Sequence, residues 1–269
     1  MAELARTVPV PSEAEPEILE DDESVGGWVQ RWVRQPNGSR EFQEFPLTPE
    51  YFLDPKWGDQ TVQGLMHGEA ARLLANVLDQ RFPDREDVLV LTDVKLLWGH
   101  REWRRPVPDV ALVQGIRDRK RALRRRSFNV AREGVRPSLI IEVVSDNPEL
   151  RRTDHVDKKE LYEREKIPEY LLLDLPRSDT DDRFQWTGYR LDAAGRYQPI
   201  EPDEAGRLFS EVTGLWFGLS PDSQQIWVTD AVTGERLLTP KEEEKARKAA
   251  EAELTRLREE IARLKGGGE

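Results

Sequence analysis

Two short apolar segments separated by a helical one constrain the fold of this chain more than any other feature. The segment SLIIEVV (138–144) is the most apolar strand-like run, and EYLLLDL (169–175) is a second one. A helix is predicted between them, from about Asp154 to Lys166, and Pro168 ends it. This order predicts a βαβ crossover, with two parallel strands inside a sheet covered on both faces.

Further elements are predicted around this unit. Apolar residues recur at helical spacing over 62–78, and a Phe-Pro-Asp sequence at 82–84 ends that helix. Strand-like runs lie at 88–91, 94–98 and 109–114, and Gly-containing segments after the second apolar strand are typical of antiparallel hairpins. We therefore expect an α/β (mixed α+β) fold, with a mixed central sheet flanked by helices, antiparallel hairpins and a C-terminal helix.

Composition divides the chain into three regions. Residues 1–40 are predicted to be an acidic, largely disordered extension, 41–238 the folded domain, and 239–269 a polar helix. Four apolar residues of that helix keep a heptad spacing over fewer than two heptads: Leu254, Leu257, Ile261 and Leu264. This pattern predicts a short coiled-coil seam, too brief to be stable alone, and a homodimer is the assembly it suggests.

Residue usage excludes several kinds of chemistry. The absence of cysteine excludes disulfides, zinc–thiolate sites and cysteine nucleophiles, and three histidines argue against a histidine-rich metal site. Metal chemistry would therefore use carboxylates, which favours magnesium, manganese or calcium. No apolar run is long enough to cross a bilayer, and the acidic start is unlike a signal or transit peptide. We expect a cytoplasmic protein with no membrane partner.

Charge is unevenly distributed along the chain. The net charge of −11 argues against a generic nucleic-acid coat protein. Residues 116–136, however, contain nine Lys and Arg against Asp118 and Glu133. The overall sign therefore does not exclude a surface that faces a polyanion.

The sharpest exception to the local patterns is Glu142, which lies among Ile and Val inside the most apolar strand. A strand covered on both faces offers no inexpensive place for a carboxylate, so Glu142 needs a metal, a cation or a raised pKa. The alternatives are an edge strand with Glu142 facing water, or a structural ion pair.

Two other residues are candidates to accompany Glu142. Asp109 opens its strand directly after Pro108, from where it could project into a cleft, although Pro-Asp alone is an ordinary turn pair. Lys158 shares a helix face with Leu161 and Tyr162, the face that would pack on the sheet. Its side chain could reach toward Glu142, or its stem could pack while the ammonium finds water.

A further acid, Glu69, is predicted on the apolar stripe of the first helix, because it lies four residues after Leu65 and four before Leu73. The alternative is an acid at the stripe's edge that extends to water. His67 lies off that stripe and is predicted at the surface or at a pocket rim.

Three segments together resemble the PD-(D/E)XK nuclease superfamily and, within it, the bacterial Uma-two family of restriction-endonuclease-like proteins. They are PDVALVQG (108–115), RRSFNVAREG (125–134) and IIEVVSDNPELRRTDHVDKKELYEREKIPEYLLLD (140–174). The last contains the family pattern of Asp154, Lys158 and Tyr162 followed by a strand that ends in Asp174. The resemblance extends over roughly residues 60–238.

The resemblance implies a restriction-endonuclease-like sheet with acids at one end of its strands. Asp109 and Glu142 would then bind a divalent cation, Mg²⁺ or alternatively Mn²⁺, with Glu69 as a further ligand. Lys158 would orient water or stabilise charge on phosphorus. The superfamily's usual lysine would fall at Val144 here, so Lys158 looks like a migrated replacement.

Two functions are therefore expected as alternatives. The first is a metal-dependent endonuclease or related phosphodiesterase acting on DNA, with Arg124, Arg125 and Arg126 as candidate phosphate contacts. The second is a catalytically inactive nuclease fold that works as an interaction module and assembles through its C-terminal helix. The net charge favours the second, whereas the set of two acids and a lysine favours the first.

Overall fold

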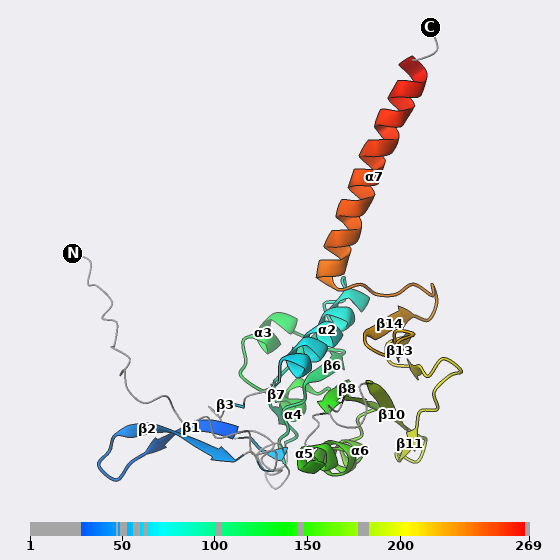
Figure 1. Cartoon of the computed structure of the whole chain (residues 1–269). Helices are drawn as coiled ribbons and strands as arrows, with labels where there is room; N and C mark the ends of the chain where they lie inside the picture. Colours follow the sequence, from blue (N-terminus) through cyan, green and yellow to red (C-terminus); the bar gives the residue numbers. More distant parts are fainter. Residues whose placement is uncertain are drawn as a thin grey trace, which may run out of the picture.

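The computed structural model describes residues 28–46, 48, 53–55, 60–61, 64–99, 104–144, 148–176 and 183–266. The acidic start, for which disorder is predicted, lies outside the described residues. Within the described part of the N-terminal extension, β1 (Trp28–Arg34) pairs antiparallel with β2 (Arg40–Pro46) and with the short β3 (Gln60–Thr61). Figure 1 shows this hairpin at the side of the main domain.

A six-stranded mixed sheet forms the centre of the domain, in the order β11-β10-β9-β8-β6-β4. Its strands are β4 (Val88–Thr92), β6 (Val110–Gln114), β8 (Pro137–Val144), β9 (Glu169–Asp174), β10 (Gln185–Leu191) and β11 (Tyr197–Pro199). The pair β8 and β9 is parallel and the other pairs are antiparallel. The predicted βαβ crossover and mixed sheet are confirmed.

Helices cover the two faces of this sheet (Figure 1). Helix α2 (Leu65–Arg81) packs on one face, where Leu139, Ile141 and Val143 of β8 join its core cluster. The connection between β8 and β9 covers the other face and consists of α5 (Pro148–Arg152), the π-helix η1 (Thr153–Lys158) and α6 (Lys159–Arg164). Ile140 and Val144 belong to the core cluster on that second face. Because side chains alternate along a strand, Glu142 also faces the η1–α6 layer.

Shorter elements complete the domain. The basic segment 116–136 contains α3 (Arg119–Leu123), β7 (Phe128–Asn129) and α4 (Val130–Glu133), and β7 pairs with β5 (Leu96–Leu97). The predicted hairpins after β9 are also present. They form β10–β11 and a separate antiparallel sheet of β12 (Leu208–Ser210), β13 (Leu215–Leu219) and β14 (Ile226–Asp230).

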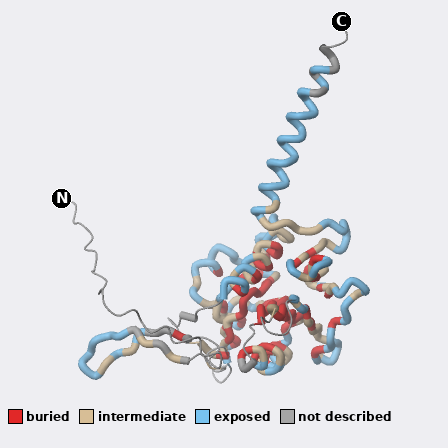
Figure 2. The backbone as a smooth tube through the Cα atoms, in the orientation of Figure 1, coloured by how far each residue is buried: buried red, intermediate tan, exposed pale blue. Residues whose placement is uncertain are grey.

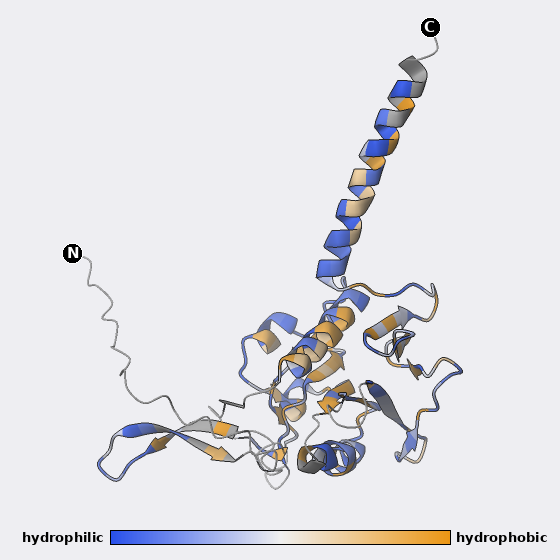
Figure 3. Cartoon of the chain, viewed as in Figure 1, coloured by the Kyte–Doolittle hydropathy of each residue, from blue (hydrophilic) through white to orange (hydrophobic). Residues whose placement is uncertain are grey.

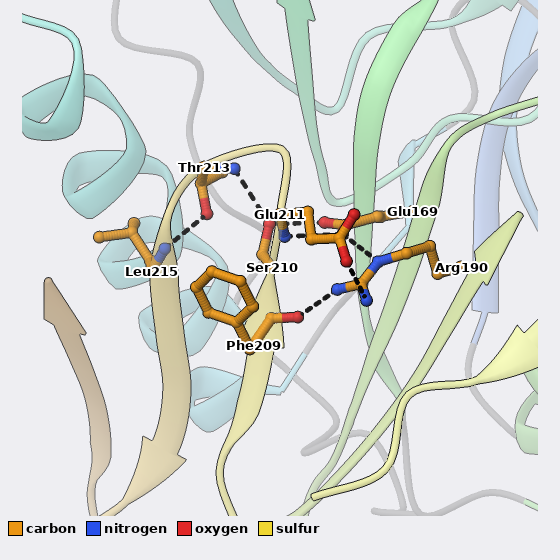
Figure 4. Close-up of polar contacts among 7 residues, drawn as sticks. All are labelled: Glu169, Arg190, Phe209, Ser210, Glu211, Thr213 and Leu215. Carbon is orange, nitrogen blue, oxygen red and sulfur yellow. Dashed lines mark hydrogen bonds and ion pairs between the residues drawn. The ribbon is translucent and has the colours of Figure 1, made fainter. Parts of the chain in front are cut away.

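A buried carboxylate joins the central sheet to the smaller one (Figure 4). Glu169 of β9 is 1% exposed and accepts hydrogen bonds from the Arg190 guanidinium, the Ser210 hydroxyl and the Glu211 backbone N–H. Arg190 also donates to the Phe209 carbonyl oxygen. The charge of Glu169 is therefore paired, and its hydrogen bonds tie β9 to the last residue of β12 and to the residue that follows it.

We expect Glu169→Gln to lower the free energy of unfolding by about 2 kcal/mol, because charge-assisted hydrogen bonds to a buried acceptor are weakened. Urea denaturation measures the change. Glu211→Gln is the matched control, since that side chain contacts the same Arg190 but is 64% exposed. Equal effects of the two substitutions would contradict this role of Glu169.

The last described element, α7 (Pro240–Gly266), extends away from the domain (Figure 1). Thr239 and Glu242 form a capping box, in which the Glu242 carboxylate accepts from the Thr239 backbone N–H and the Thr239 hydroxyl accepts from the Glu242 N–H. Figure 2 shows the buried residues inside the domain and an exposed α7. Among the described residues, no helix is both long and apolar enough to cross a membrane.

Candidate functional site

Glu142 is fully buried on β8, between neighbouring strands β6 and β9. The hydroxyl of Tyr162 donates to its Oε1 at 2.8 Å, and Lys158 Nζ lies 3.1 Å from its Oε2. The edge-strand alternative is therefore wrong. The predicted compensation is present, and the cation comes from the helical layer that faces this side of the sheet.

Lys158 ends the π-helix η1 and is 2% exposed. Its ammonium also lies 2.8 Å from Oδ1 of Asp154, which is four residues earlier in the same helix. A π-helical turn is rare and occurs often at functional sites. Lys158 was expected on the packing face and is found there. Asp154 also belongs to the cluster, although in the sequence only the family pattern pointed to it. Its spacing of four residues from Lys158 was the signal that could have predicted the ion pair.

Asp109 lies directly before β6, next to Glu142. The backbone N–H of Val143 donates to Asp109 Oδ2 at 2.8 Å, and the backbone N–H of Asp109 donates to Glu142 Oε2 at 3.3 Å. Each acid thus accepts a backbone hydrogen bond from the other's strand. Asp109 is buried and belongs to this cluster, so its place is not explained by an ordinary turn.

Helix α2 contributes His67 to the cluster, not Glu69. His67 Nε2 lies 3.3 Å from Asp109 Oδ2, and the residue is 7% exposed, so the first of its two predicted places, the open surface, is wrong. Glu69 is exposed and lines a different pocket of about 490 Å³ between α2, β14 and the start of α7. The buried face of α2 contains Ala70 and Leu74, three and seven residues after His67, whereas Leu65 is exposed.

Exposure shows from which side the cluster can be reached. The side chains of Glu142 and Lys158 are 1% and 2% exposed, whereas those of Asp109 and His67 are 10% and 9% exposed. Solvent therefore reaches the cluster on the side of Asp109 and His67. Glu142 and Lys158 form its interior.

Burial and mutual charge shift the titration of the whole cluster. Burial raises the pKa of Glu142 to about 8, with the Lys158 ammonium opposing and the Asp109 charge adding to the increase. Burial also raises the pKa of Asp154, again opposed by Lys158. Burial disfavours the Asp109 carboxylate too, but its contact with His67 holds its pKa below the usual range.

The two cations hold their protons more tightly than usual. Burial disfavours the charged form of Lys158, but Asp154, Glu142 and Asp109 raise its pKa well above its ordinary value. Burial likewise disfavours charged His67, but its hydrogen bond to Asp109 raises its pKa. Asp109 therefore stays ionised at neutral pH, whereas Glu142 readily takes up a proton.

The donor set fits a hard divalent cation. Within the described part of the chain, no three acidic or histidine side chains are arranged to share one metal ion. Mg²⁺ commonly takes only one or two protein carboxylates and completes its shell with water and phosphate oxygens. Asp109 and Glu142 are two adjacent carboxylates of this kind. His67 Nδ1 is buried without a hydrogen-bond partner among the described residues, which is typical of a site prepared for a further polar group.

A second polar cluster lies at the same end of the sheet. Asp174 ends β9 and pairs in register with Val144 of the neighbouring parallel strand. Its Oδ1 accepts from Arg151 Nη1 at 2.7 Å and contacts His155 Nε2 at 2.8 Å. Both partners come from the α5–η1 connection, so the family pattern's last acid holds this connection to the end of β9.

One protein-family model matches this chain. The Uma2 family model, described as "Putative restriction endonuclease", matches residues 58–225. This span includes all six residues of the cluster: His67, Asp109, Glu142, Asp154, Lys158 and Tyr162. The search of curated proteins found no match.

Among solved structures, a crystal structure described as a "putative nuclease" from Anabaena variabilis is similar to this chain. The sequences are 16% identical and the TM-score is 0.38. The similarity covers 57% of this chain and 78% of that one.

Proposed function

Because this chain belongs to the Uma2 family of restriction-endonuclease-like proteins, we propose that it is a divalent-metal-dependent nuclease that hydrolyses phosphodiester bonds of DNA. One observation carries the proposal. Asp109 and Glu142 are hydrogen-bonded to each other's strands, and Lys158 contacts Glu142 from the helical layer above. Two carboxylates and one lysine at the end of a sheet are the groups that such chemistry requires.

Five of the six cluster residues have a task in this proposal. Asp109 and Glu142 would hold the cation, which would supply positive charge at the scissile phosphate and acidify a water molecule. Tyr162 positions Glu142 through its hydroxyl, and His67 positions Asp109. Lys158 stabilises negative charge that develops on the phosphoryl oxygens.

Exposed cations in the basic segment of the domain support a polyanionic substrate. Arg117, Arg119, Lys120, Arg121 and Arg124 are all exposed in the basic segment that contains α3. Contacts of this kind position the nucleic-acid backbone without reading its sequence. They also offset locally the repulsion expected from the net charge of −11.

A plasmid-nicking assay with Mg²⁺ or Mn²⁺ tests the function. We expect the wild type to cleave only with the metal present, and Glu142→Gln to lower the rate about a hundredfold or more, because a metal-binding charge is lost. Glutamine has nearly the shape of glutamate and can still accept from Tyr162, so the variant is expected to fold. Glu160→Gln on α6 is the matched control, since it removes the same charge from an exposed position.

Three readings of the assay are informative. Loss of cleavage in Glu142→Gln but not in Glu160→Gln, with unchanged circular dichroism, supports the proposal. Equal cleavage by both variants would assign the activity to another site or a contaminant. No cleavage by the wild type across several DNA forms, pH values and both metals would refute the nuclease function and favour the interaction module.

A further inference from the structure

Helix α7 carries a row of apolar side chains that its own domain does not cover. Leu254, Leu257 and Ile261 are 49%, 43% and 51% exposed. Their spacing of three and then four residues places them on one side of the helix. Figure 3 shows several apolar patches, in orange, along an otherwise hydrophilic α7. Such a row is the surface that helices use to pair with each other.

We infer that α7 pairs in parallel, and in register, with α7 of a second copy of this chain. In heptad terms, Leu254 and Ile261 occupy a positions, and Leu257 and Leu264 occupy d positions. Ile261 at a with leucine at d is the combination that favours two parallel strands, whereas Leu254, at the other a position, is not β-branched. The inference concerns assembly and does not depend on the proposed nuclease activity.

The charges beside this apolar row favour a second α7 as the partner helix and favour its parallel orientation. The g positions hold Glu253 and Glu260, and the e positions hold Glu251, Arg258 and Lys265. In a parallel pair each g residue meets the e residue five positions later, so Glu253 faces Arg258 of the partner subunit. An antiparallel pair would set the g-position glutamates against each other, although Glu251 would then meet a cation at another e position. The g-position charges therefore favour the parallel direction.

Seam length indicates how strong the pairing is. Arg247 occupies the preceding a position, so the apolar seam begins at Ala250 and covers about two heptads. Because a seam this short is too brief to be stable alone, we expect a weak dimer that forms only at high protein concentration. The parallel direction places the two domains at the same end of the paired helices.

Disulfide trapping tests the direction, and the chain contains no cysteine that would interfere. Ala250→Cys puts a thiol at a d position near one end of the seam, where only a parallel pair brings the two copies of this residue together. We expect mild oxidation to give a covalent dimer of full-length Ala250→Cys. The matched control is Ala249→Cys at the outward c position, for which we expect no dimer. Trapping of both variants to the same extent, or of neither, would overturn the inference.

Charge reversal tests the pairing without a crosslink. In analytical ultracentrifugation over a roughly hundredfold concentration range, Glu253→Arg is expected to weaken dimerisation about three- to tenfold, and adding Arg258→Glu to restore it. Stronger association of the single variant would indicate an antiparallel pair. A wild type that remains monomeric throughout would show that a second copy is not the occupant of this surface.

Discussion

Replacement of Lys158 by methionine is expected to lower the free energy of unfolding by about 3 to 5 kcal/mol. Methionine retains the apolar stem but removes the ammonium that lies 3.1 Å from Glu142 and 2.8 Å from Asp154. Two buried carboxylates are then left without their cation. Guanidinium denaturation measures the change, and Lys120→Met, at an exposed position on α3, is the control for loss of one positive charge.

Two further measurements separate this cause from general damage to packing. The pKa values of Glu142 and Asp154 are already raised by burial, so without Lys158 both acids protonate more readily in the folded state. The loss of unfolding free energy caused by Lys158→Met should therefore be smaller near pH 4 than at pH 8. The double variant Lys158→Met/Glu142→Gln should lose less unfolding free energy than the sum of the two single variants, because the two side chains contact each other. A deficit independent of pH, together with simple additivity, would contradict the role assigned to Lys158.

Binding of Mg²⁺ or Mn²⁺ is expected to strengthen about tenfold per pH unit up to about pH 8 and to level off above it. The reason is that the cation must displace the proton from Glu142, whose pKa burial raises to about 8. Isothermal titration calorimetry at several pH values, in buffers of different ionisation enthalpy, measures both the affinity and the released proton. Glu142→Gln should bind more weakly and lose most of this pH dependence. An affinity of the wild type that falls or stays constant from pH 6 to 8 would argue against Glu142 as a ligand.

The metal-free protein should show the opposite dependence on pH. A carboxyl group whose folded-state pKa is raised contributes stability below its unfolded value of 4.5, and this contribution is lost as the pH rises toward 8. In the presence of a chelator, the contribution of Glu142 to wild-type stability should therefore decrease over this interval. Glu142→Gln should show a flatter profile. Added metal should stabilise the wild type most at the alkaline end.

Sequence patterns were sufficient where a residue's environment is determined by its near neighbours. The apolar runs predicted β8 and β9 and their parallel pairing, because a strand, a helix and a strand in that order have one common arrangement. Glu142 was identified for the same reason, since the residues around it require a covered strand. Helical spacing placed Lys158 with Tyr162, and both contact Glu142.

Sequence patterns were insufficient where the position of a residue depends on which face of a helix packs against the sheet. On α2 they favoured a stripe that includes Leu65 and Glu69, whereas the helix buries the face that contains His67. The hydropathy of a helix with both apolar and polar residues on several sides does not determine which face meets the sheet. Similarly, the place of Glu169 depends on Arg190 and Ser210, which lie 21 and 41 residues later in the chain.

The sequence alone determined that Glu142 must be compensated and that Lys158 lies on a helix face able to do so. Only the tertiary structure decided that Asp109, 33 residues before Glu142, hydrogen-bonds to its side chain, and that His67 contacts Asp109 in place of Glu69. The physical reason is the separation along the chain of the residues that interact. Periodicity sets the direction of a side chain relative to its own strand or helix, whereas the register of β6 on β8 and the rotation of α2 depend on packing between segments distant in the chain.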